Sequence, residues 1–316
     1  LEFRRVLSRS LLDCVPVVSA VLGPAAGSSA VRAGAAHFSI MSESQGCCFT
    51  GGPPLVRSAL GLEIDKFELG GADIHAARSG LIDNLASDEE DAFAQIRSFL
   101  SYLPTETTSL APVRDAWDEH DQDRLFSIVS PNGRRPYDVH ALIETLADVD
   151  SFFEIGGGFG RSLRTGLARI EGFPVGVLAT DNRFLAGSMD VAAARKQAAF
   201  IRMCDRFGLP LVYLVDVPGL MVGPEAEAEG ILVFGAEALR AMHEATVPVY
   251  TIQVRRSFGV GGQATGNPGP QSLRLAWPSG IWGDMPVQGG IEAAYGAAIR
   301  AAEDPEAMRR ELLERF

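Results

Sequence analysis

Two glycine-containing bends are the parts of this sequence best suited to chemistry. The first covers residues 23–28 (GPAAGS) after the apolar run 15–22, and the second covers residues 259–263 (GVGGQ) after the apolar run 247–254. A glycine-rich turn at the start of a helix directs free backbone N–H groups at one point, where they can hold a phosphate or a negative oxygen that develops during reaction. Neither bend has P-loop spacing or a clean GxGxxG with an acidic ribose partner, so the pattern favours an oxyanion over a nucleotide. The alternative that these glycines only permit tight turns stays open.

The two bends occupy equivalent places in an internal repeat. Pro16 precedes Gly27 by the same 11 residues as Pro248 precedes Gly259, and each unit later reaches a glycine pair, at 51–52 and at 289–290. Self-similarity at a fixed spacing indicates two copies of one structural unit. We therefore expect each bend to follow a strand and to open a helix.

Alternating strands and helices must position the second bend. The runs 174–181 and 210–217 predict strands, and the periodic stretches 191–207 and 231–246 predict helices, which is a βα pattern. Only 15 residues precede Pro16, so we expect the chain to begin inside its first repeat. The proline-rich and acidic stretch 104–140 is typical of a linker, and it divides the chain into parts 1–125 and 126–316.

A third candidate site is the turn Asp216-Val217-Pro218-Gly219, which ends the strand predicted at 210–217. Parallel α/β proteins bind ligands at the carboxyl ends of their strands, which favours a binding role over a solvated turn. The five histidines show no triad or metal spacing, and Ser28 does not lie in a GxSxG elbow. No metal site is predicted.

Composition excludes several classes of function. A formal net charge of -12 opposes binding to nucleic acid and to anionic lipid, because phosphate contacts rely on clustered Lys and Arg. The apolar runs are too short to cross a bilayer, and no signal peptide is evident. Four cysteines without metal or disulfide spacing indicate reduced thiols. We expect a cytoplasmic or mitochondrial-matrix protein.

Five long blocks of the sequence follow one another along the chain: VPVVSAVLGPAAG, FELGGADIHAARSG, SFLSYLP, AAFIRMCDRFGLPLVYLVDVPGLMVG and GILVFGAEALRAMHEATVPV. With these blocks in this order, the chain resembles the carboxyltransferase β subunits of propionyl-, acetyl- and methylcrotonyl-CoA carboxylases. The resemblance implies an α/β fold of the crotonase (ClpP/crotonase) type, a ββα superhelix in two related halves with the first truncated at its N-terminus.

The resemblance also implies roles for individual residues. In the family, two pairs of backbone amides stabilise the thioester enolate and the biotin ureido oxygen; here they fall at Gly27 and Ser28, and at Gly259, Val260 and Gly261. The chain departs from the family pattern at Ser28 and Val260, where glycine is usual, and at Thr180 and Ser188. The implied substrate- and biotin-binding residues are Gly23, Ala26, Asp216, Pro218, Gly219, Phe258, Gly262 and Gln263.

The implied activity is transfer of a carboxylate from carboxybiotin to the α-carbon of a short-chain acyl-CoA such as propionyl-CoA. Biotin would arrive on a partner biotin carboxylase or carrier subunit, and the site would lie between protomers of a dimer-built homo-oligomer, which we expect to be a hexamer. Two alternatives stay open: a biotin-dependent decarboxylase subunit and a divergent, non-catalytic assembly subunit. A hydratase or isomerase without biotin would need an acidic pair at the first bend, which AAGSSA lacks.

Overall fold

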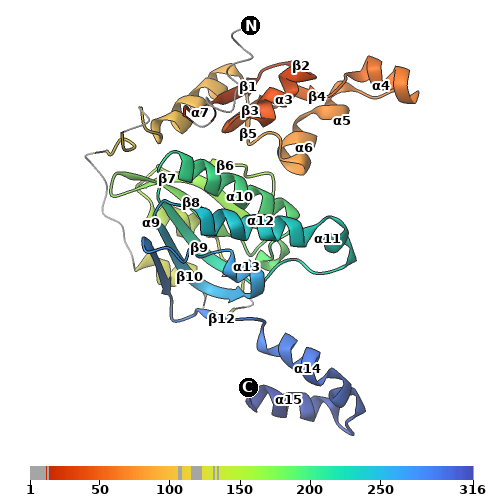
Figure 1. The fold of residues 1–316 in the computed structure, drawn as a ribbon, viewed down its shortest axis with the longest axis vertical. Helices are drawn as coiled ribbons and strands as arrows, with labels where there is room; N and C mark the ends of the chain where they lie inside the picture. The colour runs from red at the N-terminus through yellow and green to blue at the C-terminus, as the bar shows by residue number, and fades with distance from the viewer. Residues whose placement is uncertain are drawn as a thin grey trace.

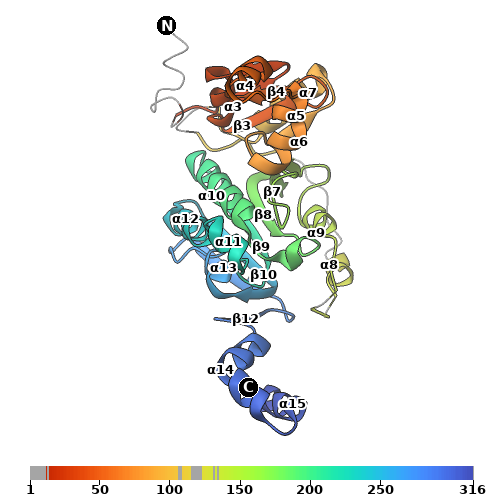
Figure 2. The ribbon, with the colours of Figure 1, turned by 90° about the vertical axis from the view of Figure 1, so that its right-hand side faces the viewer.

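The computed structural model describes residues 12, 14–105, 109–114, 123–130, 132–133 and 135–315. Three tiers follow one another along its longest axis (Figures 1 and 2): an N-terminal part, a central sheet with its helices, and a pair of C-terminal helices. The predicted division at residue 125 falls inside helix α8 (Arg124–Ile128), which packs beside α9 (Val139–Leu146) in the central tier, and the division stays a prediction.

The central sheet has the strand order β11-β10-β9-β8-β7-β6, with β12 also pairing β10. Strands β6, β7 and β8 are antiparallel, whereas β8, β9, β10 and β11 run parallel. The strands predicted at 174–181 and 210–217 are confirmed. The bounds are β6 Phe153–Ile155, β7 Leu163–Ile170, β8 Phe173–Thr180, β9 Leu211–Val217, β10 Val249–Phe258, β11 Ser272–Ala276 and β12 Ile281–Gly283.

Helices cover both faces of this sheet, which explains why its central strands are apolar on both sides. Alternate residues of β8 and β9 face α10 and α12 on one side and α9 on the other. Both helices predicted before the second bend are confirmed. The bounds are α8 Arg124–Ile128, α9 Val139–Leu146, α10 Val191–Arg206, α11 Pro224–Ala228 and α12 Ile231–Glu244, with the 3-10 turn η2 Leu185–Gly187.

The N-terminal part contains a three-stranded sheet in the order β1-β3-β5, with parallel pairs, and the separate parallel pair β2–β4. Phe38 of β3 is fully buried and stacks on Phe99 of α7 with ring centroids 4.9 Å apart. The bounds are β1 Val18–Val21, β2 Pro24–Ala26, α3 Ser28–Gly34, β3 Phe38–Ser42, β4 Cys47–Phe49, α4 Pro53–Leu60, α5 Lys66–Gly70, α6 Ala72–Ile74, π-helical η1 His75–Ser79, β5 Asn84–Ala86 and α7 Glu89–Ser101.

The strand register confirms the internal repeat. The residue two places after Pro16 pairs with Phe38, and the residue two places after Pro248 pairs with Leu273. Further on, Ala26 pairs with Phe49 and Phe258 pairs with Gly283, each directly before a bend. Residues 24–26, which the sequence placed in the first bend, therefore form strand β2, and the turn itself begins at Gly27. The glycine pairs are not equivalent, because 51–52 precede α4 whereas 289–290 lie inside α14 (Val287–Ala301).

One hydrophobic core joins the N-terminal part to the central sheet. Phe38, Ile40 and Phe99 belong to the same buried cluster as Leu167 and Ile201. The Asn84 side chain reinforces the joint by donating to the Glu154 carbonyl at 2.9 Å and accepting from the Gly156 amide at 3.2 Å. The two parts therefore bury apolar surface together, and each depends on the other for stability.

Lys196 of α10 places a buried amino group at this joint. Its Nζ donates to the carbonyls of Gly156 at 3.0 Å and Phe159 at 2.5 Å, and burial lowers the pKa of Lys196 from 10.5 to about 7. Between pH 7 and pH 10.5, Lys196 holds its proton in the unfolded chain and has lost it in the folded chain. The free energy of unfolding should therefore rise with pH over this range.

We expect Lys196→Met to remove the part of the pH dependence of the free energy of unfolding that comes from Lys196. For one proton that part is at most about 1.4 kcal/mol per pH unit. Urea unfolding at pH 7.5, 8.5 and 9.5 measures how the free energy of unfolding changes with pH. Lys66→Met, at a half-buried surface position, is the matched control and should keep the wild-type slope. Equal slopes for wild type and Lys196→Met would contradict the prediction.

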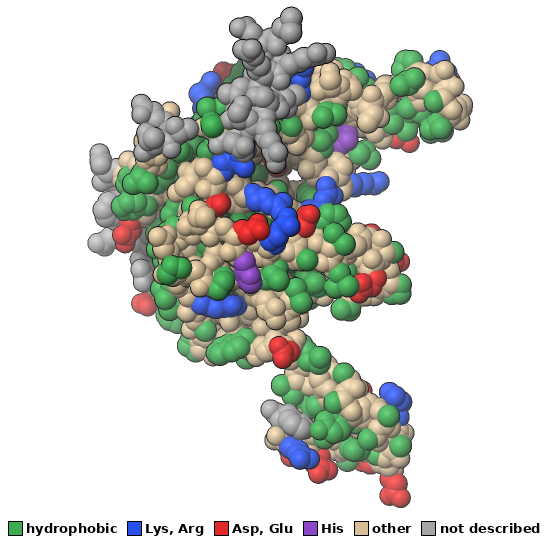
Figure 3. Space-filling model, in the orientation of Figure 1, with side chains coloured by type: hydrophobic (Ala, Val, Ile, Leu, Met, Phe, Trp, Pro, Cys, Tyr) green, Lys and Arg blue, Asp and Glu red, His purple; other side chains and the backbone are tan. Residues whose placement is uncertain are grey.

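The C-terminal helices α14 and α15 (Pro305–Arg315) form an arm. They have a small core of their own, built on Ile291, Ile299 and Leu312. The space-filling view shows this arm joined to the body by a narrow neck (Figure 3). No helix within the described ranges combines the length and apolar character that crossing a membrane requires.

Candidate functional site

The second bend lies where β10 passes into the short helix α13 (Gly259–Gln263). Gly259 has a φ of +56°, a left-handed conformation that favours glycine. The backbone N–H groups of Val260 and Gly261 donate to no acceptor among the described residues, as expected for the first turn of a helix. Two backbone donors are thus unused at one place, one on exposed Val260 and one on buried Gly261.

The turn after β9 packs directly against this bend. A Cβ atom added to Gly261 would lie 2.8 Å from the carbonyl carbon of Gly219, so the two backbones are in close contact. Gly219 has a φ of +139°, and its carbonyl accepts from the Met189 amide at 3.0 Å. The structure therefore brings together Pro218, Gly219, Phe258 and the bend, which the sequence had predicted as separate candidates.

Asp216 is committed to an internal ion pair, which corrects its predicted role as a ligand-binding side chain. Its carboxylate is fully buried. Oδ2 accepts from Arg255 at 2.7 and 3.0 Å and from Asn182 at 3.0 Å, and Oδ1 accepts from Arg256 Nε at 2.7 Å. With both oxygens occupied, Asp216 positions the end of β10 and cannot contact a ligand without breaking these bonds.

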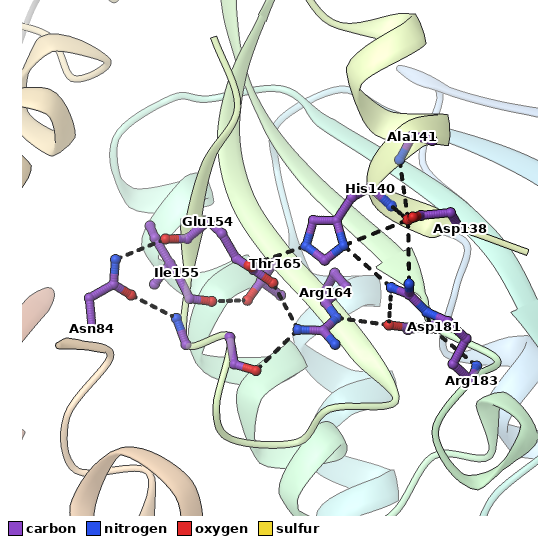
Figure 4. A network of polar contacts seen from close by, with 12 residues as sticks. Asn84, Asp138, His140, Ala141, Glu154, Ile155, Arg164, Thr165, Asp181 and Arg183 are labelled. Atoms are coloured by element: carbon purple, nitrogen blue, oxygen red, sulfur yellow. Dashed lines mark hydrogen bonds and ion pairs between the residues drawn. The ribbon is translucent and has the colours of Figure 1, made fainter. Parts of the chain in front are cut away.

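A second ion-pair network lies at the end of β8 (Figure 4). Asp181 accepts from Arg164 and from Arg183, and Glu154 pairs with Arg164 at 3.1 Å and His140 at 3.2 Å. Glu154 raises the pKa of His140, and the paired cations hold the pKa of Asp181 below its usual value despite burial. Because every charge in it is paired, this network supports the strand ends and offers no free catalytic group.

A hollow of about 540 Å³ opens beside the second bend. Glycines 259 and 262 line it together with Gln263, whose side chain is exposed. Arg274 of β11 and Trp282 of β12 complete the wall. Neither residue was predicted, since each lies on a strand that approaches the bend only through sheet pairing. Arg274 donates to Ser257 Oγ at 2.9 Å and Thr265 Oγ1 at 3.1 Å, which anchors the wall to the bend.

The first bend differs from its prediction at one residue. Gly27 has a φ of +58°, close to that of Gly259, but its amide donates to the Phe49 carbonyl at 3.0 Å. This bond continues the β2–β4 pairing, so the Gly27 amide is not free to hold a ligand, which corrects that expectation. The amide of exposed Ser28 has no acceptor among the described residues and stays a candidate donor, with Gly23 and Ala26 in the preceding segment.

One copy of the chain does not bring the two bends together. Both ribbon views place α3, at the first bend, in the N-terminal tier and α13, at the second bend, beyond α10 and α12 in the central tier (Figures 1 and 2). A site that uses both sets of amides therefore requires two copies. Among the described residues no group of histidine, cysteine or acidic side chains could hold a metal ion.

Comparison with known proteins gives consistent matches along the chain. The family model described as "Carboxyl transferase domain" matches residues 8–316. The carboxyltransferase subunit of propionyl-CoA carboxylase from Haloferax mediterranei is 36% identical over 99% of this chain and 61% of its own length. The methylmalonyl-CoA carboxyltransferase 12S subunit of Propionibacterium freudenreichii is 35% identical over 97% of this chain and 59% of its own length.

A solved structure shows the same fold. Transcarboxylase 12S, crystallised as a hexamer assembly with methylmalonyl-coenzyme A and methylmalonic acid bound, superimposes with a TM-score of 0.88 at 34% identity. The match covers 96% of this chain and 58% of that one. The predicted crotonase-like α/β fold is thereby confirmed. The chain spans about three fifths of the length of the curated relatives it matches.

Proposed function

Since the chain belongs to the carboxyl transferase family, we propose that it transfers a carboxylate from carboxybiotin to the α-carbon of a short-chain acyl-CoA, within a biotin-dependent acyl-CoA carboxylase. Carboxybiotin, when bound, would supply the carboxylate, and its ureido nitrogen would take up the proton that leaves the α-carbon, so that no side-chain base is needed. The protein main chain contributes stabilisation of negative oxygen.

The observation that carries this proposal is the pair of unused amides at Val260 and Gly261, held by backbone contact with Gly219. N–H donors fixed in place before reaction stabilise a developing oxyanion without reorganisation, and each contributes about 2.7–4 kcal/mol in related acyl chemistry. In this proposal they hold the ureido oxygen of biotin. Trp282 and the exposed amide side chain of Gln263 line the hollow beside them, which fits a compact, partly polar ring system.

The Ser28 amide in the first bend holds the enolate oxygen of the acyl-CoA in this proposal. A carbanion adjacent to a thioester is stabilised when its charge moves onto that oxygen, so a donor is most valuable there. Because the bends are far apart in one copy, the working site pairs the first bend of one protomer with the second bend of another. The proposed partners are a second copy and a subunit carrying biotin; hexamer assembly in the transcarboxylase 12S structure supports a closed homo-oligomer.

Reconstitution tests the proposal. Purified protein containing this chain, mixed with its biotin-carrying partner, ATP, bicarbonate and propionyl-CoA, should consume ATP and form carboxylated product only when every component is present. Acetyl-CoA and a branched acyl-CoA extend the panel. Release of CO2 from methylmalonyl-CoA without ATP-driven carboxylation would favour a decarboxylase subunit. Failure to bind acyl-CoA and biotin at all would favour a non-catalytic assembly subunit.

A further inference from the structure

Gln197 of helix α10 is a fully buried amide between that helix and the central sheet. Its Nε2 donates to the Ala264 carbonyl at 2.7 Å, and its Oε1 accepts from the Tyr213 hydroxyl at 2.8 Å. Because a carbonyl oxygen can only accept, the amide nitrogen is the end that faces Ala264. Burial raises the pKa of Tyr213, so the hydroxyl keeps the proton that it donates. Both ends of the Gln197 amide are therefore used, and its orientation is fixed.

Ala264 connects this buried amide to the second bend. It directly follows the short helix α13, and its N–H donates to the Val260 carbonyl at 2.9 Å. The Val260 carbonyl and the Gly261 N–H belong to one planar peptide group, so a donor that holds the carbonyl also sets the direction of the N–H. The contacts thus lead from Gln197 to one of the two unused donors of the second bend.

A space-filling role alone does not explain a polar side chain at this position. Ile201, one turn further along α10, belongs to the main hydrophobic core, and an apolar side chain at 197 would avoid the cost of taking an amide out of water. A buried polar pair with every group bonded fixes one arrangement of the elements that it joins. The next carbonyl is held in the same way, since Thr251 Oγ1 of β10 donates to the Thr265 carbonyl at 2.7 Å. Side chains from a helix and from a strand therefore hold the backbone that follows α13.

We infer that Gln197 is a positioning residue for the second bend, holding the end of α13 so that the Gly261 N–H is aimed at the negative oxygen. Gln197 acts through Ala264 and not by contact with a substrate. The inference rests on the proposed function, because the direction of this N–H matters for catalysis only if the bend holds an oxyanion.

Gln197→Met tests the inference, because it keeps an unbranched side chain and removes both hydrogen bonds. In the reconstituted carboxylase, kcat should fall roughly 10- to 100-fold while KM for propionyl-CoA stays within about twofold, as expected when a misplaced donor weakens only the transition state. Hydrogen exchange of the backbone amides at residues 259–265 should be faster than in wild type. Wild-type exchange at 259–265 in folded Gln197→Met would overturn the inference whatever the activity.

A double variant separates positioning from stability. Gln197→Met alone leaves the Tyr213 hydroxyl buried without its acceptor, so adding Tyr213→Phe should restore part of the lost stability in thermal unfolding. The kcat of the double variant should stay low, because the Ala264 carbonyl has still lost its donor. Recovery of kcat together with stability would indicate a merely structural role and contradict the inference.

Gln95 of α7 provides the matched control in the N-terminal part. Its Nε2 donates to the Leu85 carbonyl at 2.9 Å, and its Oε1 accepts from Asn84 at 3.1 Å, which is the same bonding pattern. Gln95→Met should lose stability but keep both the wild-type kcat and the wild-type exchange at 259–265. If wild-type protein forms no carboxylated product, the proposed function fails, while the exchange measurement still tests whether Gln197 holds α13.

Discussion

Replacing Asp216 with alanine is expected to lower the free energy of unfolding by about 3–5 kcal/mol, since removing one partner of a buried ion pair leaves the other charge uncompensated. The Arg255 side chain is 3% exposed and that of Asp216 is 0% exposed, so water cannot replace the lost carboxylate. Arg256 and Asn182 lose acceptors as well. Urea unfolding followed by far-UV circular dichroism measures the change.

The matched control for this prediction is an exposed ion pair. Glu292 pairs with Arg309 at 2.7 Å on the arm, where both side chains are more than a third exposed, and Glu292→Ala should change stability by less than about 1 kcal/mol. Asp216→Asn keeps the shape and one acceptor but loses the charge, so it should fall between wild type and Asp216→Ala. If Asp216→Ala proved as stable as Glu292→Ala, the ion pairs of Asp216 with Arg255 and Arg256 would have no role in holding β10.

The second large effect is expected on catalysis, from Gly259→Val. Gly259 has a φ of +56°, and a β-branched residue is strained in that conformation by about 1–3 kcal/mol. A Cβ there would also lie 3.2 Å from the Asp284 carbonyl oxygen. Relief of this strain rotates the peptide that carries the Val260 amide. If that amide is an oxyanion donor, kcat should fall about 100- to 1,000-fold.

The control for Gly259→Val must carry the same backbone strain elsewhere. Gly61 has a φ of +65° at the end of α4, and nothing lies within 4 Å of a Cβ placed there. Gly61→Val should therefore lose similar stability but keep its kcat. Steady-state carboxylation and thermal unfolding of both variants separate the two effects. A normal kcat for folded Gly259→Val would remove the second bend from the mechanism.

Local patterns in the sequence determined the helices and strands that lead to the second bend. Apolar periodicity predicted the helix observed at Val191–Arg206 and the strand observed at Leu211–Val217, because burial of one stripe or of alternate residues depends on spacing along the chain. The proline-to-glycine interval predicted the repeat, and both glycines have the positive φ that such bends require. These features are encoded within a few neighbouring residues, so the sequence alone suffices for them.

Only the tertiary structure decided how polar groups are used. Asp216 looked like a ligand-binding residue until β10 placed two arginines from 39 and 40 positions away around its carboxylate. The Gly27 amide looked free until β4 brought the Phe49 carbonyl to it. No pattern in the sequence pointed to Arg274 or Trp282 as residues of the site. The number of residues between the two bends also did not predict that they lie far apart within one copy of the chain. Each of these outcomes depends on strand register between distant segments, and a hydrogen bond or ion pair forms with whichever partner that register places within reach.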